Sequence, residues 1–221
     1  MAVPAALTSL PVNHVLGDLL AALRTNDTAI LVAPPGAGKT TVAPLALIDE
    51  PWLDGQRIVM LEPRRLAARA AAQRMAAVLG QQPGELVGYQ TRDERRIGST
   101  TRIEVVTEGV LTRRLQHDPT LPGTGLVIFD EAHERNLPTD LGLALALDGR
   151  RVVRPDLRIL VMSATLNVEA FTAALGNVPV IHSDGQAHPV DIIWAPSSAA
   201  APPRARQRRP QIEEHVVAVV Q

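Results

Sequence analysis

The chain has 221 residues, a formal net charge of −1 and no cysteine. The near-neutral charge excludes a uniformly basic nucleic-acid binder. The lack of cysteine excludes a disulfide scaffold, a cysteine-ligated zinc and a cysteine nucleophile, and it favours a cytoplasmic location. No uncharged apolar stretch reaches the roughly 18 residues of a membrane helix, so no membrane partner is expected.

Hydrophobic periodicity predicts helices and strands that alternate along the chain. The predicted helices span residues 12–23, 39–48, 64–79, 108–116, 139–147 and 168–175. The predicted strands span residues 28–33, 57–61, 86–90, 102–107, 126–129, 157–162, 178–182 and 190–194, with a charged connection between the third and the fourth. Several strands are apolar throughout, as strands are when crossover helices cover both faces of a parallel sheet. The pattern therefore predicts an α/β fold with a mostly parallel sheet.

The composition changes near the C-terminus. Residues 196–210 are rich in Pro, Ala and Arg, which is typical of a linker. Residues 211–221 then show the pattern of a new amphipathic helix. We therefore expect one domain over residues 1–195, a linker over 196–210 and the start of a second domain over 211–221, so that the native polypeptide continues.

Lys39 is the only lysine in the chain, and it lies between a predicted strand and a predicted helix. The backbone N–H groups of a Gly-rich loop, with the positive end of the following helix, can bind phosphate oxygens. Lys39 would reach the β- and γ-phosphates, and the Thr40 hydroxyl would ligate Mg²⁺. An ordinary Gly-rich turn would not explain the position of the only lysine. The predicted nucleotide-binding residues are Pro35, Gly36, Ala37, Gly38, Lys39, Thr40 and Thr41.

Two adjacent carboxylates, Asp130 and Glu131, follow the apolar segment 126–129 and begin an Asp-Glu-Ala-His sequence that ends at His133. Buried carboxylates need a partner cation. A Mg²⁺ ion held jointly by Asp130, Thr40 and the nucleotide would supply it. Glu131 could then position or deprotonate the attacking water. The alternative that these acids merely cap the next segment is the weaker one beside a phosphate loop.

Ser163, Ala164 and Thr165 follow the predicted strand 157–162. The hydroxyl groups of this triplet could hydrogen-bond His133 or the carboxylates. They could thereby link the ATP site to movement of the protein. Such a triplet is, by itself, more often a helix N-cap. Its position after the acidic segment favours a coupling role.

Together these segments resemble the motifs of DEAH-box superfamily 2 helicases, and they occur in the right order. Segments 33–41, 62–69, 107–111, 130–135 and 163–165 look like motifs I, Ia, Ib, II and III. Segments 88–92 and 107–115 bring the chain closest to the bacterial HrpB-type group. The resemblance covers roughly residues 10–194. It implies a RecA-like P-loop NTPase domain that uses ATP, or other nucleoside triphosphates, with Mg²⁺, and it adds His133 to the catalytic set of Lys39, Asp130 and Glu131.

The resemblance also implies contacts with a nucleic acid and with adenine. The implied backbone-contacting residues are Arg64 and Arg65 in one motif and Thr107, Glu108 and Gly109 in another. Contacts of this kind carry little base specificity. Arg74 matches a position from which a related protein offers an arginine to the adenine face. The expected partner is single-stranded nucleic acid, with RNA favoured, and no oligomer is implied.

The family motif that carries the arginine finger, Q-x-x-G-R-x-G-R, is absent from the 221 residues. The resemblance places it in a second RecA-like domain, whose start would be residues 211–221. Arginine fingers contribute orders of magnitude to phosphoryl transfer. The chain alone is therefore expected to bind nucleotide weakly, to hydrolyse it poorly and not to unwind a duplex.

The leading hypothesis is the first motor domain of an ATP-dependent RNA helicase. One alternative is a nucleotide-switched module that remodels nucleic acid or ribonucleoprotein without processive unwinding, and its sequence would look the same here. A DNA-directed helicase is another. A different P-loop enzyme, such as a kinase or a transport ATPase, is disfavoured by the acidic segment 130–133 together with Pro-Arg-Arg at 63–65.

Overall fold

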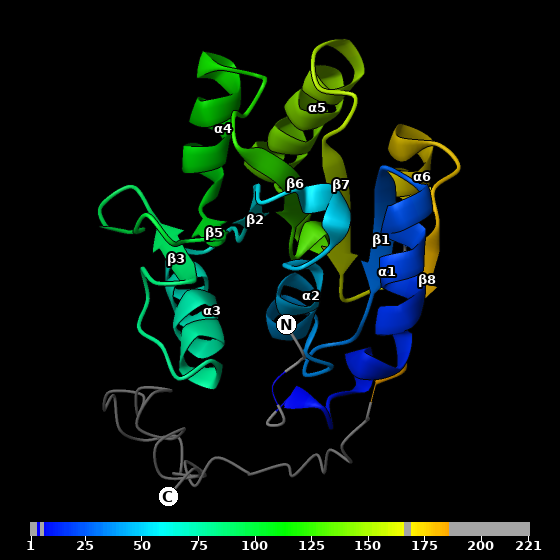
Figure 1. Ribbon diagram of the computed structural model, residues 1–221. Helices are drawn as coiled ribbons and strands as arrows, with labels where there is room; N and C mark the ends of the chain where they lie inside the picture. The colour runs from blue at the N-terminus through cyan, green and yellow to red at the C-terminus, as the bar shows by residue number, and fades with distance from the viewer. Residues whose placement is uncertain (1–3, 5–6, 166–168, 186–221) are drawn as a thin grey trace, which may run out of the picture. The chain divides into compact units, whose positions relative to one another are not determined.

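An eight-stranded sheet forms the centre of the described part of the chain (Figure 1). The computed structural model describes residue 4 and residues 7–165 and 169–185. The predicted strand 190–194, the predicted linker 196–210 and the segment 211–221 lie outside the described residues. None of the described helices is both long enough and apolar enough to cross a membrane.

The sheet is parallel except at one edge. Its order is β4-β3-β5-β2-β6-β7-β1-β8, and among these neighbours only β3 and β4 pair antiparallel. The strands are β1 (Thr28–Val32), β2 (Arg57–Leu61), β3 (Val87–Gln90), β4 (Arg95–Arg96), β5 (Ile103–Val106), β6 (Thr124–Phe129), β7 (Arg158–Ser163) and β8 (Val180–His182).

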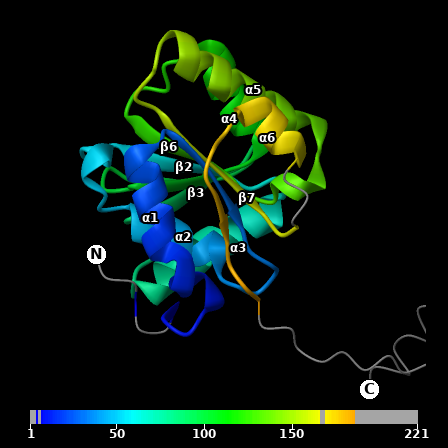
Figure 2. The ribbon, with the colours of Figure 1, turned by 90° about the vertical axis from the view of Figure 1, so that its right-hand side faces the viewer.

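Helices cover both faces of the sheet (Figure 2). One face carries α1 (Leu16–Thr25), α2 (Lys39–Leu47) and α3 (Arg65–Val78). The other carries α4 (Glu108–His117), α5 (Leu137–Val152) and α6 (Glu169–Leu175). Short 3-10 turns occupy Pro11–Val15, Pro51–Leu53 and Ala132–Glu134.

The strands contribute to two separate cores because successive side chains point to opposite faces of a sheet. In β6, Leu126 and Ile128 pack in the core under α1, α2 and α3. Val127 and Phe129 pack in the core under α4, α5 and α6. All four are fully buried. The predicted α/β fold with a mostly parallel sheet is confirmed.

Some predicted boundaries differ from the structure. The helix predicted over 12–23 begins as the 3-10 turn Pro11–Val15 and becomes α-helical only at Leu16. The helix predicted over 139–147 is α5, which is longer at both ends. The side chain of Asn136 caps its start by accepting from the backbone N–H of Thr139 at 3.0 Å. Helix ends depend on such caps more than on the apolar stripe.

Strand β4 was missed, because the charged connection in which it lies has no apolar period. Both of its residues, Arg95 and Arg96, are exposed. The pairing depends on Gly88 of β3, where an added Cβ would clash with the carbonyl oxygen of Arg96. A two-residue edge strand of this kind is specified by close backbone approach and not by hydrophobic pattern.

The topology gathers the predicted motifs at the carboxyl ends of the parallel strands. The phosphate loop follows β1, and Arg64 and Arg65 of segment 62–69 follow β2. The segment 107–109 follows β5, the acidic pair follows β6 and the segment 163–165 lies at the end of β7. All five strands are parallel, so their carboxyl ends lie on the same side of the sheet, where ligands of such sheets bind.

Candidate functional site

The phosphate loop between β1 and α2 has a backbone that requires glycine. Gly36 and Gly38 have φ angles of 80° and 94°, in the left-handed region. A Cβ added to Gly38 would also lie 2.8 Å from Cδ1 of Leu10. The loop is held from below by the 3-10 turn, because the N–H of Val12 donates to the carbonyl oxygen of Ala37 at 3.0 Å. The two glycines and this hydrogen bond therefore fix the shape of the loop.

The start of α2 fits an anion. Within residues 7–165 and 169–185, no carbonyl oxygen accepts a hydrogen bond from the backbone N–H of Gly38, Lys39 or Thr40. Unsatisfied N–H groups at a helix N-terminus carry partial positive charge and bind phosphate oxygens. Pro35 is exposed at the tip of the loop and Thr41 is half-buried in the first turn of the helix.

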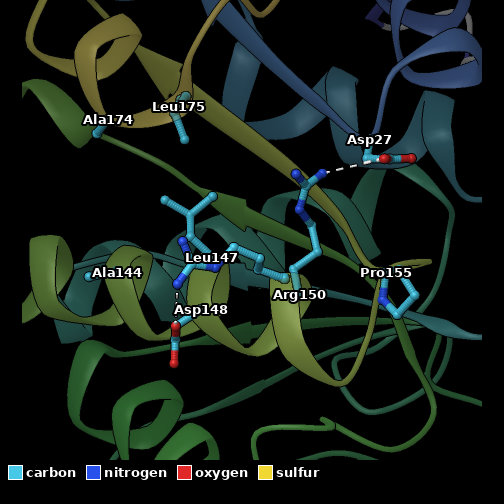
Figure 3. Close-up of a pocket in the computed structure, with 9 residues that line it drawn as sticks. Asp27, Ala144, Leu147, Asp148, Arg150, Pro155, Ala174 and Leu175 are labelled. Carbon is cyan, nitrogen blue, oxygen red and sulfur yellow. Dashed lines mark ion pairs between the residues drawn. The ribbon is translucent and has the colours of Figure 1, made fainter.

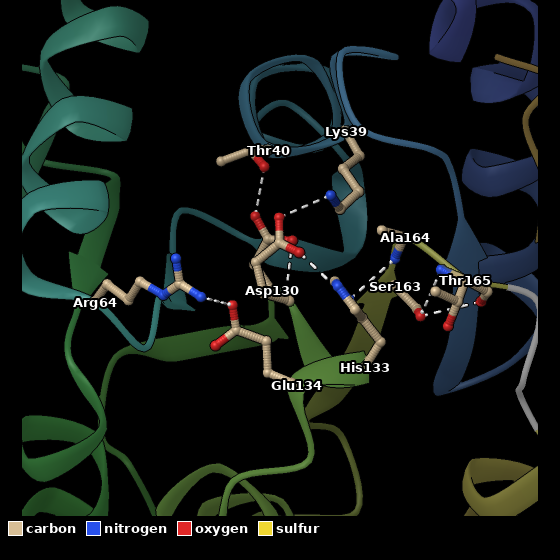
Figure 4. A network of polar contacts seen from close by, with 10 residues as sticks. Lys39, Thr40, Arg64, Asp130, His133, Glu134, Ser163, Ala164 and Thr165 are labelled. Atoms are coloured by element: carbon tan, nitrogen blue, oxygen red, sulfur yellow. Dashed lines mark hydrogen bonds and ion pairs between the residues drawn. The ribbon is translucent and has the colours of Figure 1, made fainter. Parts of the chain in front are cut away.

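Two contacts join the phosphate loop to the acidic segment (Figure 4). The Lys39 Nζ lies 2.9 Å from Oε1 of Glu131. The Thr40 hydroxyl donates to Oδ2 of Asp130 at 2.6 Å. Lys39 is 5% exposed and Asp130 is completely buried. The structure thus brings together four predicted residues from motifs about 90 positions apart in sequence.

The environment of Asp130 opposes its ionisation. Burial raises the pKa of this carboxyl to about 6, against the opposing effects of the Lys39 charge and the Thr40 hydroxyl. The backbone N–H of Glu131 donates to Oδ1 of Asp130 at 2.8 Å, with Glu131 in the left-handed region at φ 51°. A cation beside Asp130 would favour the ionised form.

The oxygen atoms at this point fit a hard cation that the nucleotide helps to hold. Asp130 and Thr40 offer a carboxylate and a hydroxyl oxygen side by side. The described His, Asp and Glu side chains form no group of three or more that could hold a metal unaided. Mg²⁺ is usually bound by one or two protein ligands plus phosphates and waters. The residues therefore fit Mg²⁺ bound together with a nucleotide.

His133 connects the acidic segment to the end of β7. Its Nδ1 accepts from the backbone N–H of Ala164 at 3.3 Å and lies 3.3 Å from Oε2 of Glu131. Among the hydrogen bonds of the described residues, none joins the hydroxyl of Ser163 or Thr165 to His133. The Ser163 hydroxyl instead donates to the carbonyl oxygen of Thr165 at 3.1 Å and accepts from its N–H at 3.3 Å. The backbone N–H of Ala164, and not a hydroxyl group, therefore joins the segment 163–165 to His133.

A cavity of about 510 Å³ opens beside these residues. Its lining includes Thr40, Glu131 and Arg74, so the predicted adenine-facing arginine shares a cavity with the phosphate loop. Glu62, at the end of β2, also lines it and was not predicted. Burial raises the pKa of the Glu62 carboxyl to about 8, and the negative charges of Asp130 and Glu131 add to the rise. Its place directly after an apolar strand was the available signal.

A second cavity, of about 430 Å³, gathers the predicted nucleic-acid contacts. It is lined by Pro63, Arg65, Arg92, Thr107, Glu108, Gly109, Val110 and Arg113. Arg92 and Arg113 are additions to the predicted set. Arg64 lines the first cavity instead, where its Nη2 lies 2.5 Å from Oε1 of Glu134.

Neighbouring arginines of α4 have different environments. Arg113 lines the second cavity. Arg114 turns inward, where it donates to Oε2 of Glu104 at 2.8 Å and to Oε1 of Gln90 at 2.7 Å. Glu104 is 2% exposed and also accepts from Arg57 at 2.7 Å. Arg114 therefore stabilises the sheet and leaves Arg113 as the surface cation.

A third cavity, of about 560 Å³, lies away from these motifs, between the C-terminal ends of α5 and α6 (Figure 3). Arg150 lies 3.5 Å from Asp27, and Arg151 lies 3.7 Å from Asp148. Asp27 precedes β1, so this cavity lies at the amino-terminal ends of the strands, whereas the phosphate loop lies at their carboxyl ends. Its charges are mutually compensated, and it contains none of the predicted site residues.

A phosphate loop that faces an acidic pair across the carboxyl ends of a parallel sheet defines a RecA-like P-loop NTPase domain. Residues 17–173 match the DEAD/DEAH box helicase family, and the chain belongs to this family. The match covers most of the described part of the chain.

The chain is similar to two helicases of Escherichia coli. It is 50% identical over 193 residues to ATP-dependent RNA helicase HrpB, covering 87% of this chain and 24% of the relative. It is 36% identical over 190 residues to ATP-dependent RNA helicase HrpA, covering 85% of this chain and 14% of the relative. The expected resemblance to the HrpB-type group is confirmed.

A solved structure gives the same result. The crystal structure of the Escherichia coli DEAH/RHA helicase HrpB matches with a TM-score of 0.79 at 51% identity, covering 83% of this chain and 23% of that chain. The chain thus spans about a quarter of the length of the HrpB protein that it matches.

Proposed function

We propose that this chain is the N-terminal motor domain of an ATP-dependent RNA helicase, in which ATP hydrolysis drives movement along a single strand. The observation that carries the proposal is the pair of contacts Lys39–Glu131 and Thr40–Asp130. They place a phosphate-binding amine, a metal-binding hydroxyl and two carboxylates in one buried cluster. Family membership and the names of the relatives favour RNA.

In this proposal the phosphate loop holds the ATP phosphates. The N–H groups at the start of α2 bind phosphate oxygens, and Lys39 exchanges its contact with Glu131 for the γ-phosphate. Asp130 and Thr40 would hold Mg²⁺, which would supply positive charge beside the phosphates. Released from Lys39, Glu131 orients the attacking water. Arg74 faces the adenine from the cavity wall.

The segment 163–165 and His133 form the coupling elements of the proposal. The supporting contact is the 3.3 Å hydrogen bond from the N–H of Ala164 to Nδ1 of His133, beside Glu131. A change at Glu131 therefore alters the environment of His133 and, through it, the end of β7. Ser163 is completely buried, which holds this strand end in place.

The second cavity is the proposed contact surface for the strand. Arg65, Arg92 and Arg113 supply positive charge around the N-terminus of α4. Arginines and a helix N-terminus favour phosphates, which position a strand without reading its sequence. Thr107 is the N-cap of α4, and Gly109 lies in its first turn. Arg64 lines the first cavity, and its side chain is exposed enough to contact the strand as well.

The proposal includes a second RecA-like domain that carries the arginine finger. This chain covers 24% of HrpB and 14% of HrpA, so both relatives are several times longer than the part that it matches. A cytoplasmic location belongs to the same proposal and is favoured by the cysteine-free sequence.

The test is the ATPase rate of the full-length natural protein with single-stranded RNA, with single-stranded DNA and without nucleic acid. We expect stimulation by RNA. Stimulation by DNA alone would favour a DNA-directed helicase, and no stimulation by either would contradict the proposal. A duplex-unwinding assay then separates a helicase from a remodelling module, because the module would hydrolyse ATP without unwinding.

A further inference from the structure

Residues 131–140, which we name the acid-to-helix segment, connect the nucleotide cluster with the proposed strand-binding surface. At one end Glu131 contacts Lys39. At the other end Thr139, in the first turn of α5, donates a hydrogen bond to Oε1 of Glu108 at 2.9 Å. Glu108 is the first residue of α4 and lies inside the segment 107–109. A single stretch of ten residues therefore touches both sites.

The bond between Thr139 and Glu108 is sheltered and well oriented. Thr139 is 4% exposed, and Glu108 is half-buried. The backbone N–H of Thr139 is already bound to the Asn136 side chain at 3.0 Å, so the cap fixes the residue that carries the hydroxyl. Helices α4 and α5 pack side by side (Figure 1). A hydrogen bond to an ionised acceptor is stronger than one between neutral groups.

The chemistry of Glu108 fits an anchoring role better than a contact with phosphate. A carboxylate is repelled by a phosphodiester, whereas Arg65 and Arg113 beside it attract one. The carboxylate of Glu108 instead accepts from α5. It thereby fixes the position of the α4 N-terminus, where Thr107, Gly109 and Val110 line the second cavity.

The start of the segment is held in a strained backbone. Glu131 and Arg135 have φ angles of 51° and 50° and bracket the 3-10 turn Ala132–Glu134. Left-handed residues other than glycine persist only where their surroundings hold them. Arg135 is held by Asp140 at 3.1 Å and lies 5.3 Å from the ring centroid of Phe171. Such a turn can change conformation when the contact of Glu131 changes.

We propose that Thr139 is a positioning residue that couples the nucleotide cluster to the strand-binding surface within this one domain, through its hydrogen bond to Glu108. The inference rests on the proposed function. When Glu131 leaves Lys39, the strained turn adjusts and shifts the first turn of α5. Thr139 transmits the shift to Glu108 and so to the segment 107–109. By linkage, a strand bound at that segment alters nucleotide binding to the same extent.

A second connection runs beside it but contributes less. Glu134 lies 2.5 Å from Arg64 (Figure 4), whose side chain is 72% exposed. Exposed ion pairs are screened by water and salt and contribute little. The sheltered bond of Thr139 is therefore the one that we expect to carry most of the coupling.

The test replaces Thr139 by valine in the full-length natural protein, which removes the hydroxyl and keeps the shape. The matched control is Thr112→Val in α4. The Thr112 hydroxyl is buried and has no hydrogen-bond partner among the described residues, so its loss breaks no contact of this kind. The readout is the ratio of the ATPase rate at saturating single-stranded RNA to the rate without RNA.

For Thr139→Val we expect this ratio to fall by at least about threefold, with an unchanged basal rate and an unchanged Kd for ATP in the absence of RNA. Thr112→Val should keep the wild-type ratio, and Thr139→Ser, which retains the hydroxyl, should restore most of it. A wild-type ratio in Thr139→Val would overturn the inference and leave the proposed function standing. A wild-type protein that RNA does not stimulate would overturn both.

The variant Glu108→Ala removes the acceptor and keeps the inference testable if the valine variant does not fold. It should also lower the ratio, and a wild-type ratio in it would overturn the inference. Where both variants fold, the double variant should lower the ratio no further than either single change, because both break one bond. Additive losses would show that the residues act separately and would equally overturn the inference.

Discussion

The ammonium group of Lys39 lies 2.9 Å from the carboxylate of Glu131, so the proposed γ-phosphate ligand is paired with the proposed water-positioning acid. Lys39 is only 5% exposed, so water does little to stabilise its charge. The carboxylate of Glu131 compensates that charge. A bound γ-phosphate would compete with Glu131 for the ammonium group. The pair therefore links arrival of the nucleotide to release of the acid that acts on it.

Replacing Lys39 by alanine removes the proposed charge partner of the γ-phosphate and the lysine that contacts Glu131. We expect the ATPase rate of the full-length natural protein to fall roughly a hundredfold or more. Lys39→Met, which keeps much of the buried aliphatic stem, should lose activity equally. The rates are measured at saturating ATP and RNA. Wild-type turnover in either variant would show that Lys39 does not act on the phosphate.

Glu131→Gln should separate binding from chemistry. The amide can still accept a hydrogen bond from Lys39, but it cannot take a proton from water. We expect the Kd for ATP to change little, while single-turnover hydrolysis slows by about a hundredfold. The neighbouring Glu134→Gln is the control and should retain most of the turnover, because that acid pairs with the exposed Arg64. Normal hydrolysis by Glu131→Gln would remove it from the proposed mechanism.

The buried carboxyl of Glu62 should make stability depend on pH. Its pKa is raised from 4.5 to about 8, first by burial and then by the charges of Asp130 and Glu131. The folded state therefore binds this proton more tightly than the unfolded state does. The stabilisation is fully present below about pH 4.5 and is lost as pH rises towards 8.

Glu62→Gln, which cannot ionise, should remove this dependence. Without nucleotide and divalent cations, we expect the Tm of the variant to exceed that of the wild type more at pH 8 than at pH 6. Thermal unfolding at a series of pH values measures the difference. A constant difference across this range would mean that Glu62 is ionised in the folded protein at pH 6.

Adjacent arginines of α4 should respond differently to the same change. Arg114→Met leaves the buried Glu104 with Arg57 as its remaining partner, and should cost about 3 kcal/mol of stability by urea unfolding. Arg113→Met should change stability by no more than about 0.5 kcal/mol. It should weaken binding of single-stranded RNA and lower the salt slope of that binding by about 1. The opposite assignment of the two effects would contradict the proposed surface.

Local sequence was sufficient for the parts of the site that lie within one motif. A phosphate loop needs particular residues at adjacent positions after an apolar strand. That pattern can be recognised from residues 28–40 alone. The same holds for the acidic pair after strand 126–129. Alternating apolar runs likewise predicted the α/β class, because burial of both sheet faces demands them.

Contacts between motifs could not be derived in this way. The Thr139–Glu108 bond and the place of Glu62 beside the acidic pair depend on which strands become neighbours in the sheet. Sequence also could not separate Arg113 from Arg114. Successive residues of a helix point in directions about 100° apart, and packing against the sheet decides which of them is buried.

The sequence by itself determined the class of domain, the phosphate loop and the order of the motifs, because each depends on short-range pattern and backbone chemistry. Only the tertiary structure decided which side chains meet. It paired Lys39 with Glu131 and Thr139 with Glu108, since both pairings arise from the parallel order of strands far apart in the chain.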